Sequence, residues 1–359
     1  MKKIDKYLLI AVIILSLFGL LMIYSSSNIW AEYKFNDPYK YLKSQGIFLI
    51  MGYFLIYFFA KTDHFLYKKY SNVILIICIV LLILVLIPGI GSVRNGSRSW
   101  FGIGSFGIQP SEFAKLGLII FTSKYLANNK IKNIKTSVLP ILAVVLLIFG
   151  LIMLQPDFGT GVILVITIIA LLFVSGVNMN FFIKLGILGL IGIVILVIIA
   201  PYRLERITSF LNPWNDPLGS GFQIIQSLYA IGPGGLLGMG LGNSIQKHFY
   251  LPEPQTDFIF SIISEELGFA GILIVSLLFI TIIYRGIYIS LKQEDKFSKY
   301  LAFGISFSFA FQTLLNLMVV VGLIPVTGVT LPFLSYGGSS LLVSMVSIGI
   351  LLNISKHNS

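Results

Sequence analysis

The chain has 359 residues, of which 57% are hydrophobic and 11% are charged, and its formal net charge is +11. Soluble domains contain about 25% charged residues, so this composition excludes an ordinary soluble protein and predicts an integral membrane protein. The apolar runs approach the roughly 20 residues that cross a bilayer as a helix. They lack the alternation expected of an outer-membrane barrel.

Ten apolar segments are predicted to cross the membrane as helices. The first follows three lysines and is long for a signal peptide, and no A-x-A-like cleavage site comes after it, so we expect it to be retained. The predicted spans are 7–24, 45–60, 73–90, 111–127, 138–154, 159–175, 181–200, 257–283, 300–322 and 335–354. They form one polytopic domain over 1–359, with both termini on one side of the membrane. The single cysteine, Cys78, lies inside a span and predicts no disulfide.

The positions of Lys and Arg orient these spans. Sixteen fall on the side of the termini and eight on the opposite side, which places both termini in the cytoplasm by the positive-inside rule. Because topology accounts for most of the positive charge, the composition indicates no nucleic-acid partner. The outer face then carries two long loops, 91–110 and 201–256. Within the second loop, the run 207–231 predicts a helix lying at the membrane interface.

Ionisable residues in or beside spans are the candidates for chemistry, because a charge at mid-membrane costs about 2.5–3.5 kcal/mol on insertion scales. Glu112 and Lys115 are three residues apart at the start of the fourth span, after Pro110, which suits a first helical position. We expect them to pair, either as a structural ion pair or as part of a catalytic site.

A second acid, Asp157, lies in the turn 155–160 (QPDFGT), where Asp commonly caps the following helix. Its neighbours in the predicted topology favour a further role, since several charged residues map to the same outer end of the bundle. They are Arg94, Arg98, Glu112, Lys115, Asp157 and Asp257. This is the arrangement expected of a polar site facing the outer leaflet.

Asp257 lies where a polar segment gives way to the eighth span. It can serve as a helix cap, which would lower its pKa, as a reaction centre, or as both. On one straight helix, Glu265 and Glu266 would lie about 12–13 Å deeper and point elsewhere, beyond the roughly 5–9.5 Å of glycosidase carboxylate pairs. If Asp257 is catalytic, it is therefore predicted to act alone as a base. The two glutamates are predicted to be buried and paired with polar partners on neighbouring helices.

Motifs for metal or nucleophile chemistry are weak. The histidines have no partner at i, i+4, and neither H-E-x-x-H nor G-x-S-x-G occurs. The glycine-rich run 232–242 (GPGGLLGMGLG) lacks the spacing of a phosphate loop and predicts close backbone packing or a flexible turn.

Seven segments, in family order, resemble the SEDS family (shape, elongation, division and sporulation). They are 95–100 (NGSRSW), 109–115 (QPSEFAK), 155–160 (QPDFGT), 211–214 (LNPW), 219–230 (GSGFQIIQSLYA), 250–260 (YLPEPQTDFIF) and 331–340 (LPFLSYGGSS). Residues 251–257 (LPEPQTD) are similar to the division and sporulation branch, FtsW and SpoVE. The elongation branch, RodA, tends to carry Arg-His before the Thr-Asp pair.

The resemblance implies an all-α bundle of ten transmembrane helices with a large extracellular loop between helices 7 and 8. It also implies a peptidoglycan glycosyltransferase that polymerises lipid II at the outer face of the bacterial plasma membrane. Asp257 matches the family's essential acid, Glu112 and Lys115 match its fourth-helix pair, and Asp157 matches another acid implicated in activity. The implied partners are a class B penicillin-binding protein, which is a transpeptidase, and other membrane proteins of division or sporulation.

The implied reaction inverts the anomeric centre, because lipid II is an α-linked pyrophosphate and the glycan is β-1,4 linked. A single displacement needs one base, and we expect Asp257 to take the proton from the C4 hydroxyl of the acceptor. The leaving undecaprenyl pyrophosphate needs cations, with Mg or Mn as a supplement whose ligands are unassigned. The expected supporting or substrate-binding residues are Arg94, Arg98, Glu112, Lys115, Asp157, Arg203, Arg206, Lys247, Ser335, Gly337 and Gly338.

Two other functions stay open from the sequence. A transporter that flips lipid II would suit acids buried in the membrane, although the sequence shows none of the paired broken helices typical of inverted-repeat transporters. The other alternative is a non-catalytic scaffold for the division machinery. Glycan formed by the purified protein from externally supplied lipid II would separate the enzyme from both.

Overall fold

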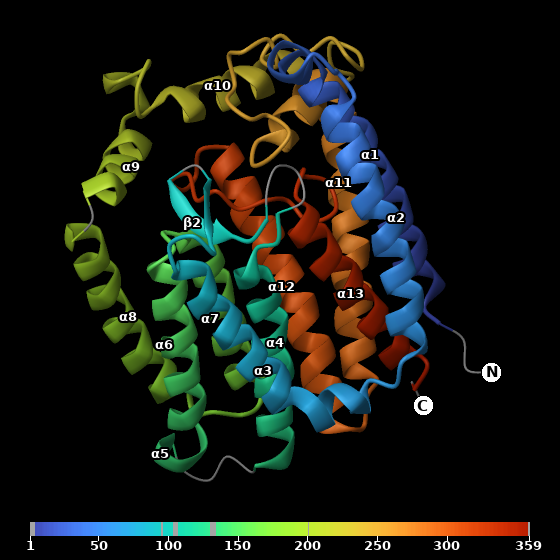
Figure 1. Ribbon diagram of the computed structural model, residues 1–359, viewed down its shortest axis with the longest axis vertical. Helices are drawn as coiled ribbons and strands as arrows, with labels where there is room; N and C mark the ends of the chain where they lie inside the picture. Colours follow the sequence, from blue (N-terminus) through green and yellow to red (C-terminus); the bar gives the residue numbers. More distant parts are fainter. Residues whose placement is uncertain (1–3, 95, 103–106, 130–133, 200, 358–359) are drawn as a thin grey trace.

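A computed structural model describes residues 4–94, 96–102, 107–129, 134–199 and 201–357, except for the side chains at 134–135, 193, 196 and 201–203. The described part is a helical bundle with a short β-hairpin near one end (Figure 1). The long helices are α1 (Lys6–Phe35), α2 (Lys40–Lys61), α3 (Phe65–Leu86), α4 (Pro110–Asn128), α6 (Leu139–Met153), α7 (Phe158–Val174), α8 (Met179–Ile199), α11 (Ile259–Leu291), α12 (Lys296–Val320) and α13 (Gly338–Ser355). The shorter elements are β1 (Ser92–Arg94), β2 (Ser97–Trp100), α5 (Ile134–Ser137), α9 (Pro201–Leu211), the 3₁₀ turn η1 (Pro213–Asn215), α10 (Phe222–Ile231) and the 3₁₀ turn η2 (Gly232–Gly234).

Each predicted span coincides with one of the long helices. Within the described residues, seven helices are long and apolar enough to cross a membrane, and α6 and α7 are shorter apolar helices. The start of α1 and the end of α13 lie at the same end of the bundle (Figure 1). A helical, multi-pass membrane protein is therefore confirmed. The count of ten spans and the side of the membrane assigned to each loop stay predictions.

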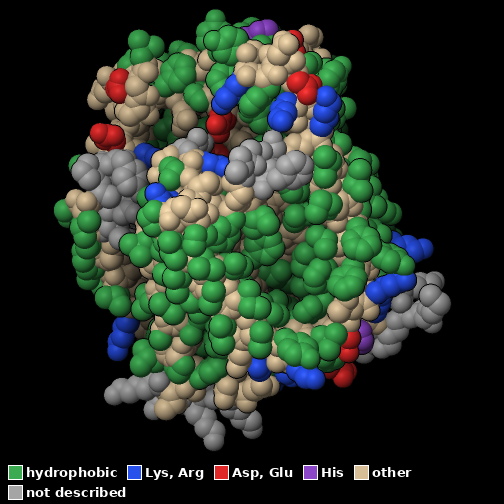
Figure 2. Space-filling model, in the orientation of Figure 1, with side chains coloured by type: hydrophobic (Ala, Val, Ile, Leu, Met, Phe, Trp, Pro, Cys, Tyr) green, Lys and Arg blue, Asp and Glu red, His purple; other side chains and the backbone are tan. Residues whose placement is uncertain are grey.

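The surface has the polarity of a protein surrounded by lipid. Apolar side chains cover the middle of the visible face, and Lys, Arg, Asp and Glu gather toward both ends (Figure 2). Helix α8 stands at the edge of the bundle, where it leads into α9 (Figure 1), and its apolar stretch is not buried by other parts of the protein. A helix of this length and composition suits the interior of a lipid bilayer.

Aspartates cap three of the long helices. Asp5 accepts from Leu8 N in α1 (3.0 Å), Asp157 from Thr160 N in α7 (3.2 Å), and Asp295 from Ser298 N in α12 (2.8 Å). Each satisfies a backbone N–H that the helix itself cannot. The capping role predicted for Asp157 is confirmed.

The capping role predicted for Asp257 is wrong. Helix α11 begins at Ile259, its N-cap residue is Phe258, and no side chain caps it. The carboxylate of Asp257 is therefore left for another purpose.

Helix α11 is broken at Gly268, whose φ of 61° and ψ of −157° are not helical. The loop 201–256 replaces the lost helical bonds, because Phe269 N donates to Gly235 O (2.9 Å) and Ala270 N to Leu236 O (3.0 Å). A Cβ on Gly268 would lie 2.4 Å from Gly238 N, so only glycine fits. The eighth predicted span is therefore not one straight helix, and the depth estimated from a straight helix does not hold beyond Gly268.

The loop 201–256 is more segmented than predicted. The run 207–231 is not one helix: α9 ends at Leu211, η1 follows, and α10 starts at Phe222. The glycine-rich run packs closely, as one of its two predicted alternatives stated. A Cβ on Gly234 would lie 2.2 Å from Ser264 O of α11, and one on Gly238 would lie 2.2 Å from Glu266 O.

Residues 321–337, here called the α12–α13 connection, are non-helical, and 331–335 are buried. The connection reaches the middle of α1, because a Cβ on Gly19 would lie 2.4 Å from Phe333 O. Irregular backbone at such depth is tolerated only inside protein, where its polar groups find partners. Here Leu331 N donates to Ser335 Oγ (2.8 Å) and Ser335 N donates to Leu331 O (3.0 Å).

Candidate active site

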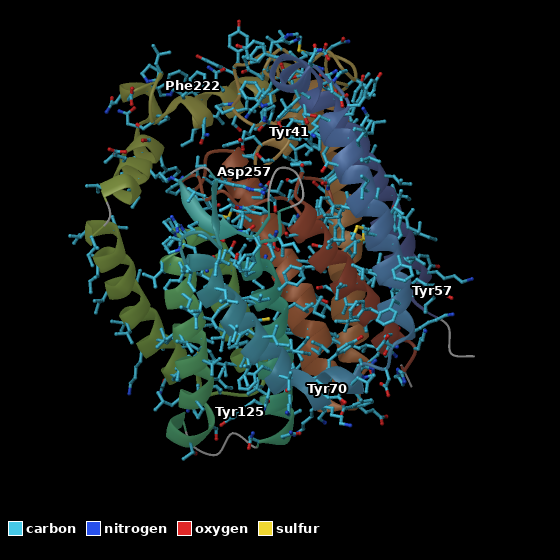
Figure 3. All side chains as sticks on the ribbon, in the orientation of Figure 1. Tyr41, Tyr57, Tyr70, Tyr125, Phe222 and Asp257 are labelled. Atoms are coloured by element: carbon cyan, nitrogen blue, oxygen red, sulfur yellow. The ribbon has the colours of Figure 1, made fainter. Side chains whose placement is uncertain are left out.

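Asp257 lies directly before α11 at one end of the bundle. Figure 3 shows it toward the same end as Tyr41 and Phe222 and away from Tyr125. The side chain is half-buried, and the described residues donate no hydrogen bond to its carboxylate. The α12–α13 connection passes beside it, since a Cβ on Gly328 would lie 3.8 Å from Asp257 Oδ2. The carboxylate can therefore accept a proton from an incoming group.

Burial raises the pKa of Asp257 from 3.8 to about 6. Repulsion from Glu253 adds to the rise, attraction from Arg206 opposes it, and Asp157 contributes a smaller repulsion. The expectation that a helix terminus lowers this pKa is wrong, because α11 starts after Phe258 and burial dominates. A base with a pKa near 6 is mostly ionised at neutral pH and still binds a proton readily.

Asp157 joins two helices at this end. Its Oδ2 accepts from Gln109 Nε2 (2.9 Å) and from Ser111 Oγ (3.1 Å), both at the start of α4, while its Oδ1 caps α7. These bonds occupy both oxygens. Asp157 is thus held in place within electrostatic reach of Asp257.

The β1–β2 hairpin lies against the turn that carries Asp157, because Ser97 Oγ donates to Gln155 O. Its two arginines are half-buried, and Arg94 stacks on the ring of Trp100 at 4.8 Å. Nη2 of Arg94 and Nη1 of Arg98 are buried without a hydrogen-bond partner among the described residues. Buried donors without partners require an explanation, and an anionic ligand would supply one.

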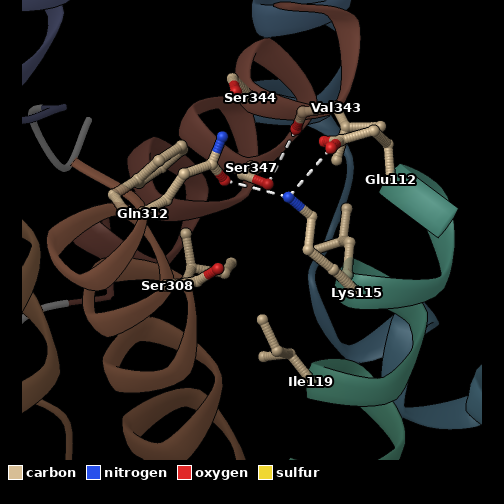
Figure 4. Close-up of a pocket in the computed structure, with 11 residues that line it drawn as sticks. Glu112, Lys115, Ile119, Ser308, Gln312, Val343, Ser344 and Ser347 are labelled. Carbon is tan, nitrogen blue, oxygen red and sulfur yellow. Dashed lines mark hydrogen bonds and ion pairs between the residues drawn. The ribbon is translucent and has the colours of Figure 1, made fainter. Parts of the chain in front are cut away.

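Glu112 and Lys115 form the predicted ion pair, with Lys115 Nζ 3.1 Å from Glu112 Oε1. Both are buried, and Lys115 also donates to Gln312 Oε1 on α12 (2.9 Å), as Figure 4 shows. The pair borders a cavity of about 30 Å³ between α4, α12 and α13, lined in part by Ser308 and Ser344. A polar cavity of this size can hold an ordered water molecule.

The backbone around Asp257 is held by three successive hydrogen bonds. Gln255 O accepts from Tyr336 N (2.8 Å), and Thr256 O accepts from Ser335 Oγ (2.6 Å). Asp257 O accepts from Asn316 Nδ2 of α12 (2.8 Å). Ser335 was expected to support the site or bind substrate. The structure places it behind Asp257 as a backbone anchor.

The predicted cations are distributed unequally. Arg206 of α9 is exposed, donates to Val326 O in the α12–α13 connection (2.9 Å), and acts on the pKa of Asp257. The side chain of Arg203 lies outside the described residues. Lys247 was predicted to support the site or bind substrate. Its ammonium is instead buried in an ion pair, 3.2 Å from Glu266 Oε1.

Gly337 and Gly338 make contacts with α2. Gly337 N donates to Gln45 Oε1 (3.3 Å), and a Cβ on Gly338 would lie 2.5 Å from the ring of Phe48. Gly338 is therefore a close-packed position at the start of α13, and Gly337 is tied to α2 by its backbone hydrogen bond. Any contact with substrate stays a prediction.

Glu265 and Glu266 are buried and hydrogen-bonded, as predicted. Glu266 accepts from Ser25 Oγ of α1 (2.6 and 2.7 Å), and Glu265 accepts from Ile245 N (2.8 Å) and Ser244 Oγ (2.5 Å). The predicted partners were polar groups on neighbouring helices. Apart from Ser25, the partners come instead from the loop 201–256. The two acids therefore fasten the loop to α11.

A divalent cation finds no preformed protein site in the described residues, where no group of three or more His, Cys, Asp or Glu side chains could hold a metal ion. We therefore assign no protein ligands to a divalent cation and no step of the reaction to one.

Sequence reasoning missed several polar residues that build this site, among them Gln45, Gln312 and Asn316. Gln312 and Asn316 lie one helical turn apart within the apolar span 300–322. Polar side chains on one face of a transmembrane helix commonly bond to neighbouring elements, and this spacing was the available signal.

Comparison with known proteins shows consistent similarity. The family of cell cycle proteins FtsW, RodA and SpoVE matches residues 5–359. Stage V sporulation protein E of Bacillus subtilis is 52% identical over 356 residues, covering 99% of this chain and 97% of that protein. The probable peptidoglycan glycosyltransferase FtsW of Trichlorobacter lovleyi is 42% identical over 353 residues, covering 98% and 93%.

Two solved structures share the fold. A chain from a peptidoglycan synthase complex, described as coordinating polymerization and crosslinking, matches with a TM-score of 0.81 and 29% identity, covering 99% of this chain and 98% of that chain. The crystal structure of Thermus thermophilus rod shape determining protein RodA matches with a TM-score of 0.74 and 27% identity, covering 99% and 97%.

Proposed function

The chain belongs to the FtsW/RodA/SpoVE family of cell cycle proteins, and from this membership we propose that it is a peptidoglycan glycosyltransferase acting in division or sporulation. It polymerises lipid II into β-1,4 glycan strands at the outer face of the bacterial plasma membrane. The observation that carries the proposal is the carboxylate of Asp257, half-buried, without a hydrogen-bond donor among the described residues, and with a pKa raised to about 6.

Asp257 acts as the general base. Its carboxylate takes the proton from the C4 hydroxyl of the acceptor sugar, whose oxygen attacks C1 of the donor sugar. The bond between C1 and the pyrophosphate oxygen breaks, and undecaprenyl pyrophosphate leaves with the electron pair. The configuration at C1 changes from α to β in this one displacement.

Arg94 and Arg98 bind the leaving pyrophosphate and stabilise its negative charge. Their buried guanidinium nitrogens without partners lie on a hairpin fastened to the turn of Asp157, and preorganised donors of this kind stabilise developing charge. Arg206 adds a third cation near Asp257. Glu112 and Lys115 support the site from within the bundle, where their burial leaves them a structural role.

The enzyme works with a class B penicillin-binding protein, a transpeptidase that crosslinks the strands, and with other membrane proteins of division or sporulation. Support comes from the similarity to a chain of a peptidoglycan synthase complex. Undecaprenyl pyrophosphate-linked glycan is the growing product.

The test is polymerisation of lipid II by the purified protein, with and without a class B partner and with and without chelator. The Asp257→Asn variant, shown to be folded and to bind its partner, should make no glycan. Near-normal glycan output from that variant would remove Asp257 from the base role.

The same assay separates the enzyme from a lipid II transporter and from a scaffold. Neither alternative forms glycan from externally supplied lipid II. An inactive wild-type protein that moves lipid II between leaflets of a vesicle would favour the transporter.

A further inference from the structure

Helix α12 presents two polar side chains toward the site, one turn apart. Gln312 and Asn316 are 5% and 1% exposed in a helix that is otherwise mostly apolar. A buried amide in a membrane protein requires hydrogen-bond partners, so the partners of these two residues show what they hold.

Asn316 connects Asp257 to the segment that faces it. Its Nδ2 donates to Asp257 O (2.8 Å) and to Val329 O (2.7 Å). Val329 follows Gly328, the residue beside the Asp257 carboxylate. One amide group thus fixes both the backbone that carries the carboxylate and the backbone that lies against it.

Gln312 makes the equivalent connection to the buried ion pair. Its Nε2 donates to Thr330 O (2.9 Å), the carbonyl next to Val329 O, and its Oε1 accepts from Lys115 Nζ (2.9 Å). Glu112 holds that ammonium from the other side. Hydrogen bonds on both sides of the covalent link between Val329 and Thr330 therefore connect the ion pair, through α12 and the α12–α13 connection, to Asp257.

We propose that Asn316 and Gln312 are positioning residues for glycosyl transfer, which set the place of the Asp257 carboxylate relative to the acceptor hydroxyl; this inference rests on the proposed function. Neither amide touches the reacting atoms. Each acts through backbone carbonyls, and the Glu112–Lys115 pair acts on Asp257 through Gln312.

The alternative is that both amides only satisfy buried carbonyl groups. Loss of Asn316 would lower stability under either explanation, because two buried carbonyls would lose a donor. Only the positioning role predicts a change in the chemical step, since a displacement of about 1 Å in a reacting group can cost roughly a hundredfold in rate.

The test compares Asn316→Leu with a matched control, Asn353→Leu. Asn353 is also a buried asparagine, at the opposite end of the bundle, where its Nδ2 donates to Ala60 O (3.0 Å) and its Oδ1 accepts from His64 N (3.1 Å) and lies 2.9 Å from His64 Nδ1. Both substitutions remove buried hydrogen bonds of similar number and leave a side chain of similar size. Thermal unfolding, kcat, KM for lipid II and the pH profile of kcat are measured for both in the presence of the class B partner.

Asn316→Leu should lower kcat by roughly a hundredfold with little change in KM. It should also move the acid limb of the pH profile of kcat to lower pH. Once its backbone is released, the Asp257 carboxylate becomes more exposed to water, and burial then raises its pKa less. The groups that face Asp257 stay in place: Glu253 beside it, Asp157 before α7 and Arg206 on α9. Asn353→Leu should lose stability and keep both kcat and the acid limb.

Gln312→Leu should lower kcat in the same way but less. Asn316→Ser, which is smaller and keeps one donor, should give an intermediate kcat, and it replaces Asn316→Leu if that variant is not recovered folded. An active wild type with unchanged kcat in the Asn316 variants would overturn this inference alone. An inactive wild type would overturn the proposed function as well.

Discussion

Replacing Asp257 by Asn should abolish polymerisation and at the same time stabilise the protein. Because the pKa of Asp257 in the folded protein is about 6, above its ordinary value of 3.8, ionisation opposes folding. At 1.36 kcal/mol for each pKa unit, and with a reduction for the partial exposure of the side chain, the cost is about 2–3 kcal/mol. Asn has nearly the same shape and carries no charge, so it removes this cost.

The sign of the effect depends on pH. Below about pH 4 the carboxyl group is protonated in both folded and unfolded protein, and the variant gains nothing. Between pH 4 and 6 the folded wild type keeps its proton while the unfolded chain loses it, so the advantage of Asn grows. Above pH 6 the advantage is complete.

The assay is thermal unfolding of wild type and Asp257→Asn in the same detergent at pH 4.5 and pH 8, together with glycan synthesis at pH 8. We expect the variant to melt several degrees higher at pH 8 and to show a smaller difference at pH 4.5. A helix cap at this position would give almost no change in melting temperature, because Asn caps a helix about as well as Asp. A variant that melts below wild type at pH 8 would refute this account of Asp257.

Three further predictions concern groups around the site. Glu112→Gln should lower the free energy of unfolding by about 3–5 kcal/mol, because it leaves Lys115 buried without its carboxylate. Chemical unfolding should show that adding Lys115→Met recovers part of this loss. Glycan output should fall less than in Asp257→Asn. Glu253→Gln should move the acid limb of the pH profile of kcat to lower pH, because it removes a charge that raises the pKa of Asp257. Arg206→Gln should move that limb to higher pH, because it removes a charge that lowers the same pKa. Shifts in the same direction would contradict this. Glu266→Gln should lower the free energy of unfolding by about 3–5 kcal/mol, because it leaves the buried ammonium of Lys247 without its carboxylate. It should also make the loop 201–256 easier to cleave by proteases. Unchanged proteolysis would show that the loop is held by other contacts.

The sequence was sufficient where one physical rule decides the outcome. Hydropathy located every long helix, Pro110 marked the start of α4, and the three-residue spacing of Glu112 and Lys115 predicted their ion pair. Asp157 followed the ordinary rule for a capping residue. In each case the interaction is local, within one helix or at its end.

The sequence was insufficient where contacts between distant segments decide. Lys247 looked like a free cation in a loop, and its pairing with Glu266 depends on how that loop folds onto α11. Asp257 looked like a cap because it precedes an apolar run, but α11 starts two residues later. The break at Gly268 depends on the backbone of Gly235 and Leu236, which a helical pattern cannot reveal.

The α12–α13 connection also bears on the order in which the protein becomes functional during its synthesis. Asp257 is translated before the residues that hold its backbone, Asn316, Ser335 and Tyr336, all of which belong to the final part of the chain. A ribosome makes the chain from the N-terminus, so the earlier helices enter the bilayer while this anchor does not yet exist. Asp257 therefore reaches its position in the complete bundle only after α12 and its connection have been made, and an incomplete chain lacks these anchors.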